Sequence, residues 1–381
     1  MNPSMLLCTV GTSLFYPNLE GLKTALSTGK IRPEHRALAE AYAQQDWMAV
    51  AQQLTGIKAE ERLCGAEINS IASLLRHDYI AQDCGLFFLH SDTPNGQAIA
   101  NILQQYYRAQ GHALVETVKV EDLQDQDPRR FRTKGLRQLA RELCKILRER
   151  TPAACAINAT GGYKAQIAIA VLLGQAIGVP VFYKHELFPE IIAFPPMPVA
   201  LDFELWMRSS GMLFDLVRDL NPAPFSLYAD EWSEAYESLV ERVNIDGQEY
   251  LELSPTGQIF HDTFRERFRS HRDHVLPPPI PTAQKRPPRL EAAGWPGAHP
   301  EVRRFMEEVT AANPWVSHCA TFYYNPDLGE RTRFRPGAHG IEGIFSDGSY
   351  TVKFRIETSA QTTGQQSAVV AALNEWLDSR R

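Results

Sequence analysis

The chain has 381 residues, more than one hydrophobic core usually serves, so we expect two or three domains. Its net charge of −6 argues against a protein that binds nucleic acid with its whole surface. The longest apolar stretch, Ile167–Phe182, is broken by Gln175 and Pro180, so we expect no membrane span. No basic leader precedes the first apolar run, which favours a cytoplasmic location.

The cysteines show no CxxC spacing of the kind that holds zinc. They are Cys8, Cys64, Cys84, Cys144, Cys155 and Cys319. Several lie in or beside apolar runs, so we expect reduced core residues and no metal site.

Over residues 1–200, short apolar runs alternate with helical patterns. The predicted strands are Met5–Val10, Gly85–His90, Leu114–Val120, Ala153–Asn158 and Val179–Tyr183. The predicted helices are Glu34–Leu54, Glu67–His77, Gly96–Ala109, Lys134–Arg150 and Tyr163–Ile177. Strands separated by helices predict a mainly parallel sheet, with ligands bound beyond the carboxyl ends of its strands.

Three turns follow predicted strands, and the third, Asn158–Lys164, leads directly into a helix. Free N–H groups and the helix dipole favour an anion at such a place. Its glycines let a ligand approach the backbone, Thr160 offers a hydroxyl, and Lys164 offers a charge suited to phosphate. The turn matches neither the Walker A pattern nor GxGxxG. A tight turn without a ligand is the alternative, but three converging turns favour a site.

The strand ending Val10–Leu14, paired with Asn158–Lys164, resembles the CARF domain of CRISPR-associated effectors. The resemblance covers about residues 1–200 and implies a Rossmann-like homodimer that is activated by a cyclic oligoadenylate. Among these rings we expect cyclic tetra-adenylate. The resemblance places Thr12 and Ser13 at one part of the ring, and it leaves open whether the ring is cleaved. The candidate ligand-binding residues are Gly11, Thr12, Ser13, Ser91, Asp92, Asn158, Thr160, Gly161, Gly162, Tyr163 and Lys164.

Residues 201–275 predict a connector that resembles a winged helix-turn-helix. We expect helices at Asp202–Leu220, at Glu231–Val243 and from Ser254 to about His274, with a hairpin around Asp246-Gly247. DNA binding is the alternative function of such a segment. However, the predicted helix Glu231–Val243 carries four glutamates and one arginine, which would repel phosphates.

Prolines over residues 276–297 predict a semi-rigid linker. Residues 298–381 then predict a small α+β module with an antiparallel meander. Its expected elements are helices at Pro300–Ala312 and Gln365–Arg381 and strands at Trp315–Tyr324, Arg331–Arg335, Gly340–Phe345 and Tyr350–Thr358.

Cationic residues gather on two of these strands. Alternation puts Arg331, Arg333 and Arg335 on one face, and Lys353 and Arg355 share a face of a later strand. A solvated strand face is the alternative, but clustered like charges destabilise neighbouring strands unless an anion compensates them.

The pattern of the C-terminal module resembles the RelE family of ribosome-dependent messenger RNA interferases. The resemblance implies RNA cleavage without metal or cofactor, by attack of a ribose 2′-OH on the adjacent phosphate. We expect Arg333 and Arg335 to stabilise the developing charge and Arg331 to contact the RNA backbone. We expect Lys353 or His339 to act as the acid or base, and Arg355 to clamp a phosphate.

The whole chain thus resembles the CARF–RelE fusions of type III CRISPR defence, with the ribosome, messenger RNA and the ribosomal stalk proteins as expected partners. The predicted fold is multidomain α/β: a CARF domain over 1–200, a connector over 201–275, a linker over 276–297 and a RelE-like domain over 298–381. Two other classes remain open.

One is a CARF–winged-helix transcription regulator. The other is a ribosome-independent nuclease, because Arg269 and His274 match the R-x4-6-H spacing of HEPN ribonucleases. A HEPN domain needs a helical bundle around the motif, whereas a proline tract follows here. A cationic helix end that complements the dipole explains the same residues.

Overall fold

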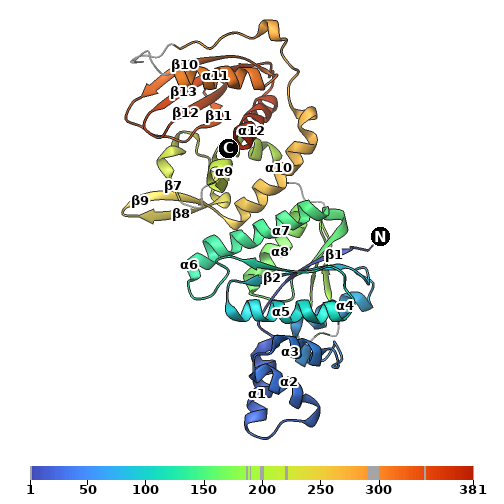
Figure 1. The fold of residues 1–381 in the computed structure, drawn as a ribbon. Helices are drawn as coiled ribbons and strands as arrows, with labels where there is room; N and C mark the ends of the chain where they lie inside the picture. Colours follow the sequence, from blue (N-terminus) through green and yellow to red (C-terminus); the bar gives the residue numbers. More distant parts are fainter. Residues whose placement is uncertain are drawn as a thin grey trace. The chain divides into compact units, whose positions relative to one another are not determined.

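The computed structural model describes residues 2–185, 188, 190–197, 201–218, 222–290, 300–338 and 340–380. The chain divides into two compact units, Met1–Ala200 and Leu201–Arg381 (Figure 1). Among the described residues, none of the helices has the length and apolar character that a bilayer crossing requires.

The first unit is built on a six-stranded sheet with the order β3-β2-β1-β4-β5-β6. The strands are β1 (Met5–Thr9), β2 (Gly85–Ser91), β3 (Val115–Val120), β4 (Cys155–Asn158), β5 (Val181–Tyr183) and β6 (Ile192–Phe194). All neighbours are parallel except β5 and β6. The predicted parallel sheet is confirmed. The order reverses between β1 and β4, where ligands bind in sheets of this kind.

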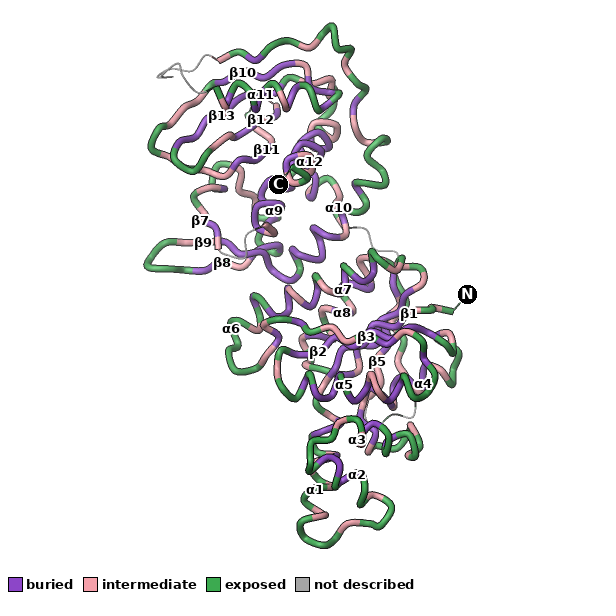
Figure 2. The backbone as a smooth tube through the Cα atoms, in the orientation of Figure 1, coloured by how far each residue is buried: buried purple, intermediate pink, exposed green. Residues whose placement is uncertain are grey.

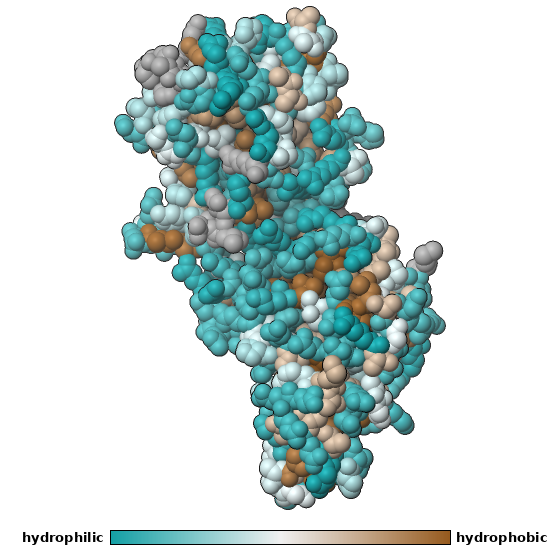
Figure 3. Space-filling view, viewed as in Figure 1, coloured by the Kyte–Doolittle hydropathy of each residue, from teal (hydrophilic) through white to brown (hydrophobic). Residues whose placement is uncertain are grey.

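Helices cover both faces of this sheet. Figure 1 shows α7 (Leu136–Arg150) and α8 (Lys164–Ile177) on one face and α4 (Gly65–Arg76) and α5 (Pro94–Ala109) on the other. The central strands β1 and β2 are almost wholly buried, whereas the helices keep exposed sides (Figure 2). A hydrophobic surface patch lies over α8 (Figure 3), and Leu172 of that helix is 38% exposed.

The single helix predicted at Glu34–Leu54 is wrong. The segment forms α2 (Arg36–Ala43) and α3 (Trp47–Leu54), which accompany α1 (Glu20–Ser27). Gln45 has a φ of 57°, which a helix interior does not allow, and the Asp46 side chain then accepts the N–H of Ala49 to begin α3.

The second unit contains a four-stranded antiparallel sheet with the order β10-β13-β12-β11. These strands are β10 (Val316–Asn325), β11 (Arg333–Gly337), β12 (Gly340–Ser346) and β13 (Thr351–Thr358). The helices are α9 (Phe203–Arg218), α10 (Pro255–Val275), α11 (Pro300–Ala312) and α12 (Thr363–Ser379). The predicted α+β character of this region is confirmed.

The helix predicted at Glu231–Val243 is also wrong. Residues 229–231 and 234–239 form short 3₁₀ turns, and β8 (Val240–Ile245) follows. It pairs with β9 (Gln248–Leu253), which in turn pairs with β7 (Ala223–Pro224). The tight turn has positive φ at Asp246 and Gly247, so the predicted hairpin is present. The pairing of β8 with β9 extends back to Val240. Residues 240–243, whose sequence spacing suggests a helix, therefore form part of a strand.

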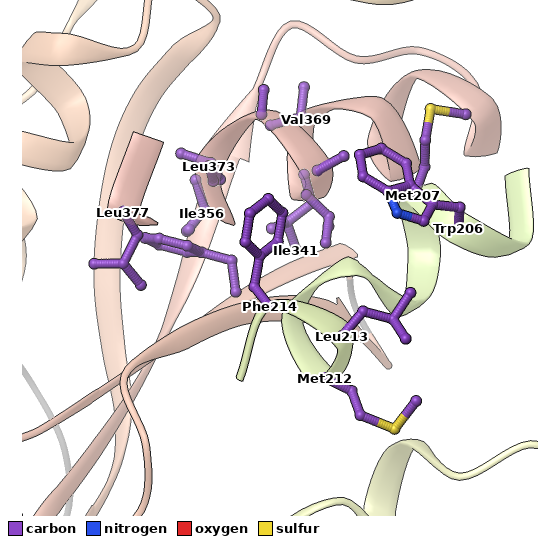
Figure 4. Packing of buried hydrophobic residues seen from close by; sticks show 14 of the residues in the cluster. Trp206, Met207, Met212, Leu213, Phe214, Ile341, Ile356, Val369, Leu373 and Leu377 are labelled. Atoms are coloured by element: carbon purple, nitrogen blue, oxygen red, sulfur yellow. The ribbon is translucent and has the colours of Figure 1, made fainter. Parts of the chain in front are cut away.

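One hydrophobic cluster joins α9 to the four-stranded sheet and α12. Figure 4 shows Phe214 of α9 among Ile341, Leu373 and Leu377. Asn374 of α12 is buried in this cluster, where its Nδ2 donates to the Ser210 hydroxyl at 3.2 Å. The expected connector and the expected C-terminal module therefore share a core within the second unit.

The described part of the proline-rich segment lies along the edge of the four-stranded sheet. The backbone N–H of Ile280 donates to Pro314, that of Arg286 to Ser317 and that of Arg289 to Cys319. The segment thus covers the outer side of β10 and protects a strand edge that would otherwise be unpaired.

Replacing Asn374 with alanine should loosen both sides of the shared core. The amide of Asn374 accepts from Phe334 N at 2.9 Å and donates to Phe334 O at 2.8 Å, so its loss leaves two buried backbone groups unpaired. We expect a loss of about 2–4 kcal/mol in unfolding free energy.

Hydrogen exchange should then rise in both α9 and β11. Ser379→Ala on the same helix is the control, because Ser379 is exposed and bonds only to Trp376 O. Faster exchange in β11 alone would contradict a common core.

Candidate functional site

A pocket of about 320 Å³ opens in the first unit beyond the carboxyl ends of β1, β4 and β5. Each strand supplies a residue just past its end: Ser13 after β1, Thr160 after β4 and Lys184 after β5. Helix α4 supplies Ala66, Asn69 and Arg76 from one face, because these positions are separated by three and seven residues. The pocket therefore lies at the topological switch point of the sheet.

The pocket lining combines cations with exposed aromatic rings. Arg62, Arg76 and Lys184 supply positive charge. Tyr16 and Phe188 are each 50% exposed, which is unusual for large rings. Burial, and then the charge of Arg76, lowers the pKa of Lys184. An anion would relieve this repulsion while bases stack on the rings, so the site suits a ligand that carries both phosphates and bases.

Thr160 joins the ends of two strands. Its hydroxyl donates to Asn158 Oδ1 at 2.6 Å and accepts from Lys184 N at 3.0 Å. Asn158 is buried and donates from Nδ2 to the Ser70 hydroxyl of α4 at 2.8 Å. The chain of contacts fixes Thr160 and Lys184 relative to α4, so the polar side of the pocket is built on rigid elements.

The glycines in the loops after β1 and β4 allow the backbones of the two loops to pack closely. A Cβ on Gly11 would lie 2.5 Å from Gly162 N, and one on Gly161 would lie 2.1 Å from Glu67 Oε1. Thr9 Oγ1 donates to Gly161 O at 2.5 Å and closes the same junction. The loops that follow β1 and β4 therefore contact each other directly, which places Ser13 and Thr160 at one pocket.

Glu67 of α4 lies beneath this junction and is 1% exposed. Its Oε1 accepts from Gly11 N at 2.6 Å. Burial raises the pKa of Glu67 to about 7. Sequence reasoning missed this residue, because a glutamate in the first turn of a helix is ordinarily a solvated partner of the dipole.

The predicted ligand residues divide into those that line the pocket and those that support it. Ser13 and Thr160 line it, whereas Gly11, Asn158, Gly161 and Gly162 lie behind them. The Thr12 carbonyl accepts from Phe15 N and Tyr16 N, and so shapes the turn that carries Tyr16. The Tyr163 ring packs at 5.2 Å from that of Phe131, and Lys164 begins α8; neither is among the lining residues.

The turn after β2 lies beside the pocket and does not line it. Ser91 shares a hydrogen bond with Thr93, and Asp92 pairs with Lys119 at 3.4 Å. Asn95, in the first turn of α5, donates to the Tyr16 hydroxyl at 3.4 Å. Its contribution to the pocket is therefore to hold an aromatic ring.

The lining residues that sequence reasoning missed include all three cations. Lys184 directly follows a predicted strand, so the rule that selects the three turns also applies to it. Arg76 and Asn69 share a helical face, a weaker signal because most polar helix faces are solvated.

In the second unit the structure brings four predicted cations onto one sheet face. Arg335 of β11 lies opposite Glu342, which lies opposite Arg355 of β13. Arg333 of β11 likewise lies opposite Ile344 of β12, which lies opposite Lys353 of β13. Arg331 precedes β11 and donates to the Asp215 carbonyl at 3.2 Å, and His339 lies outside the described residues.

Carboxylates compensate most of these cations. Arg333 is 1% exposed and lies 3.1 Å from Glu231 and 3.6 Å from Glu330. Lys353 lies 3.1 Å from Glu330 and 3.8 Å from Asp230.

Arg335 is bound by Glu342 at 3.3 Å and by Asp230 at 3.6 Å. Asp230 and Glu231 come from the segment before β8, Glu330 from the turn before β11, and Glu342 from β12. The face is therefore an internally paired network with little surplus charge at β11.

The outer part of the face is different. Arg355 is exposed and lies over the ring of Phe322 at 5.4 Å, and Lys353 lies over Tyr323 at 5.1 Å. Phe322 is 37% exposed. Cations beside open aromatic rings suit a single-stranded nucleic acid, because bases stack while phosphates pair.

Two further hypotheses concern metal and the arginine-rich helix. Among the described residues, no group of His, Cys, Asp and Glu could hold a metal ion. Arg269 pairs with Glu375 of α12 at 2.5 Å, and the His274 ring lies 6.4 Å from that of His271.

Changing Glu67 to glutamine tests the buried carboxylate. The folded state holds the proton more tightly than the unfolded chain, so the unfolding free energy of the natural protein falls as the pH rises from about 4.5 to about 7. Glutamine still accepts from Gly11 N but does not ionise. The variant should therefore gain up to about 3 kcal/mol at pH 8 relative to the natural protein.

That difference should vanish at pH 4.5, where the carboxyl group is largely protonated in the folded state. Hydrogen exchange of the β1 amides at the two pH values measures it. A variant that is equally stabilised at both pH values would contradict burial as the cause.

Comparison with known proteins connects this unit with CRISPR systems. Residues 62–197 match the family model described as CRISPR-associated protein (Cas_APE2256). The match includes Arg76, Thr160 and Lys184 of the pocket. No curated protein matches the chain. Over roughly a third of its length, the chain is thus similar to a CRISPR-associated protein family.

Proposed function

We propose that the chain is a CRISPR-associated effector in which the first unit binds a cyclic oligoadenylate and the second cleaves messenger RNA on the ribosome. The observation that carries the proposal is the pocket of the first unit. It joins three cations to two half-exposed aromatic rings at the switch point of a parallel sheet. The similarity to a CRISPR-associated family over residues 62–197 supports the same function.

Cyclic tetra-adenylate fits the chemistry of this pocket. Arg62, Arg76 and Lys184 pair with its phosphates, while Tyr16 and Phe188 stack on adenines. The Ser13 hydroxyl lines the pocket and accepts from Ala66 N at 2.9 Å, so its position is fixed against α4. The ring is larger than one pocket, and two identical half-sites would read it symmetrically.

The surface of α8 supports a homodimer. An apolar helix whose outer side is open usually covers that side with a partner. Leu172 is exposed, and Ile167, Ile169, Val171 and Ile177 are only partly buried. Two copies that meet through α8 would bury these residues.

The cationic sheet face is the proposed site of RNA cleavage. A ribose 2′-OH attacks the adjacent phosphate, forms a bond to phosphorus and expels the 5′-oxygen, which leaves a 2′,3′-cyclic phosphate and a 5′-OH. Arg355 lies beside the exposed ring of Phe322 and Lys353 beside the partly buried ring of Tyr323, where they can hold the RNA and stabilise the phosphorane charge. Arg333, Arg335 and Lys353 are all paired with carboxylates, so activation must exchange Asp230, Glu231 and Glu330 for phosphate.

Alanine at Arg76 or Lys184 should weaken cyclic tetra-adenylate binding by tenfold or more, because each removes a cation from a partly desolvated site. Calorimetric titration measures this. Arg36→Ala is the control: Arg36 pairs with Glu40 as Arg76 pairs with Glu60, but it lies outside the pocket. Unchanged affinity in both pocket variants would reject the site.

Cleavage requires a separate assay, with translating ribosomes and messenger RNA in the presence and absence of cyclic tetra-adenylate. Lys353→Ala and Arg355→Ala should lower activated cleavage by about 100-fold, as expected when phosphorane stabilisation is lost. Arg286→Ala is the control, since Arg286 is an exposed cation that pairs with Glu357.

His274→Ala separates the proposal from a HEPN-like nuclease. Cleavage that is lost only in this variant would contradict the RelE-like site. Specific binding of duplex DNA without any RNA cleavage would instead favour a transcription regulator.

A further inference from the structure

A strongly cationic segment of the first unit lies outside the pocket of that unit. Residues 128–150 contain nine lysines and arginines and two glutamates, a net charge of +7. The whole chain carries −6, so the remaining residues carry −13. The segment forms α6 (Pro128–Arg130), one irregular turn and α7.

Helix α7 separates its apolar and charged residues sharply. Leu139, Leu143 and Leu147 are buried against the sheet. Arg141, Lys145 and Arg148 are exposed, and their spacing of four and three residues puts them on one side of the helix. Four more exposed cations precede them: Arg129, Arg130, Arg132 and Lys134. We refer to these seven cations as the α6–α7 face, which Figure 3 shows as hydrophilic surface.

A groove of about 450 Å³ follows this face. Lys119 and Glu121 line it from the β3 side, and the three exposed cations of α7 line it together with Gln138 and Glu142. The groove is distinct from the pocket beyond β1, β4 and β5, because the two share no lining residue.

The acids nearby compensate only part of the charge. Glu142 lies 4.0 Å from Lys145, Asp122 pairs with Arg130 at 2.5 Å, and Lys119 is held by Asp92 and Glu121. Among the described residues, the side chains of Arg129, Lys134 and Arg141 have no ion-pair partner. Like charges one helical turn apart are unfavourable, so the surplus favours an external anion.

The absence of exposed apolar anchors narrows the identity of that anion. Within 128–150, which the structure describes throughout, no large hydrophobic side chain is exposed. Membrane surfaces bind cationic helices that also insert apolar groups, and protein interfaces depend on buried aromatic or aliphatic anchors. A second copy of the face would repel the first.

We propose that the α6–α7 face binds the phosphate backbone of RNA without reading its sequence. Seven of the nine cations in the segment are arginines. The planar guanidinium group of an arginine can donate two parallel hydrogen bonds to the oxygens of one phosphate. The choice of RNA over DNA rests on the proposed function, in which an acidic protein must reach the ribosome. A local cationic face supplies that contact through ribosomal RNA.

The test uses the full chain and a fluorescent RNA hairpin of about 20 nucleotides, with binding measured by anisotropy over a range of salt concentrations. The variant is Arg141→Gln/Lys145→Gln/Arg148→Gln. We expect at least a tenfold loss of affinity for the RNA. The slope of log affinity against log salt concentration should also become shallower, by the amount that corresponds to about two or three lost phosphate contacts. The matched control, Lys23→Gln/Arg32→Gln/Arg36→Gln, removes three exposed cations elsewhere in the unit and should stay within twofold.

Binding of cyclic tetra-adenylate, measured in the same variant, should be unchanged, which shows that the fold and the pocket are intact. Loss of RNA binding with ring binding retained supports the α6–α7 face even if no cleavage is ever seen. Equal losses in variant and control would overturn the proposal. The proposal would also be overturned if polyglutamate displaced the fluorescent RNA hairpin as strongly as unlabelled RNA does. Tighter binding of a DNA hairpin than of the RNA hairpin of equal length would overturn it as well.

Discussion

The pocket of the first unit depends on a packing constraint between two loops and one buried carboxylate. Gly11 and Gly161 bring the loops after β1 and β4 into backbone contact, and Glu67 accepts the N–H of Gly11 from below. No side chain fits at either glycine without displacing backbone. This contact brings Ser13 and Thr160 to the same opening. The carboxylate is tolerated there because burial keeps its proton affinity high, so the uncharged form is accessible near neutral pH.

The second unit satisfies a different constraint, since a buried cation requires a partner. Arg333 is nearly inaccessible, and its guanidinium donates to Leu227 O at 2.6 Å besides pairing with Glu231 and Glu330. Removing one member of such a network would leave an uncompensated charge, so the segment around Glu231 and the turn before β11 are held together. The same kind of pairing also occupies three of the cations expected to act on RNA, Arg333, Arg335 and Lys353.

The sequence predicts the elements well where a single local pattern decides them. Of the five parallel strands, all except β3 are mainly apolar runs, and the turn at Asp246-Gly247 identifies its hairpin because both residues adopt positive φ. Prediction failed where tertiary pairing overrode local spacing, as for Glu231–Val243. In the pocket it found Ser13 and Thr160, which lie in turns after strands. It missed Arg76, which lines the pocket, and Glu67, which lies beneath the loops, because charged residues on a helix are ordinarily solvated.

The distribution of charged residues shows most clearly that neighbours in the sequence differ from neighbours in the folded protein. A window over residues 331–355 holds five cations and two acids, which suggests an open cationic surface. Folding then brings Asp230, Glu231 and Asp215 to that face from more than 90 residues away and neutralises most of it. Around residues 128–150, by contrast, the acids that pair with Arg130, Lys145 and Arg150 compensate only part of the positive charge. Because charges act over about 8 Å in physiological salt, the field that a nucleic acid meets is set by such spatial neighbourhoods and hardly by the total of −6.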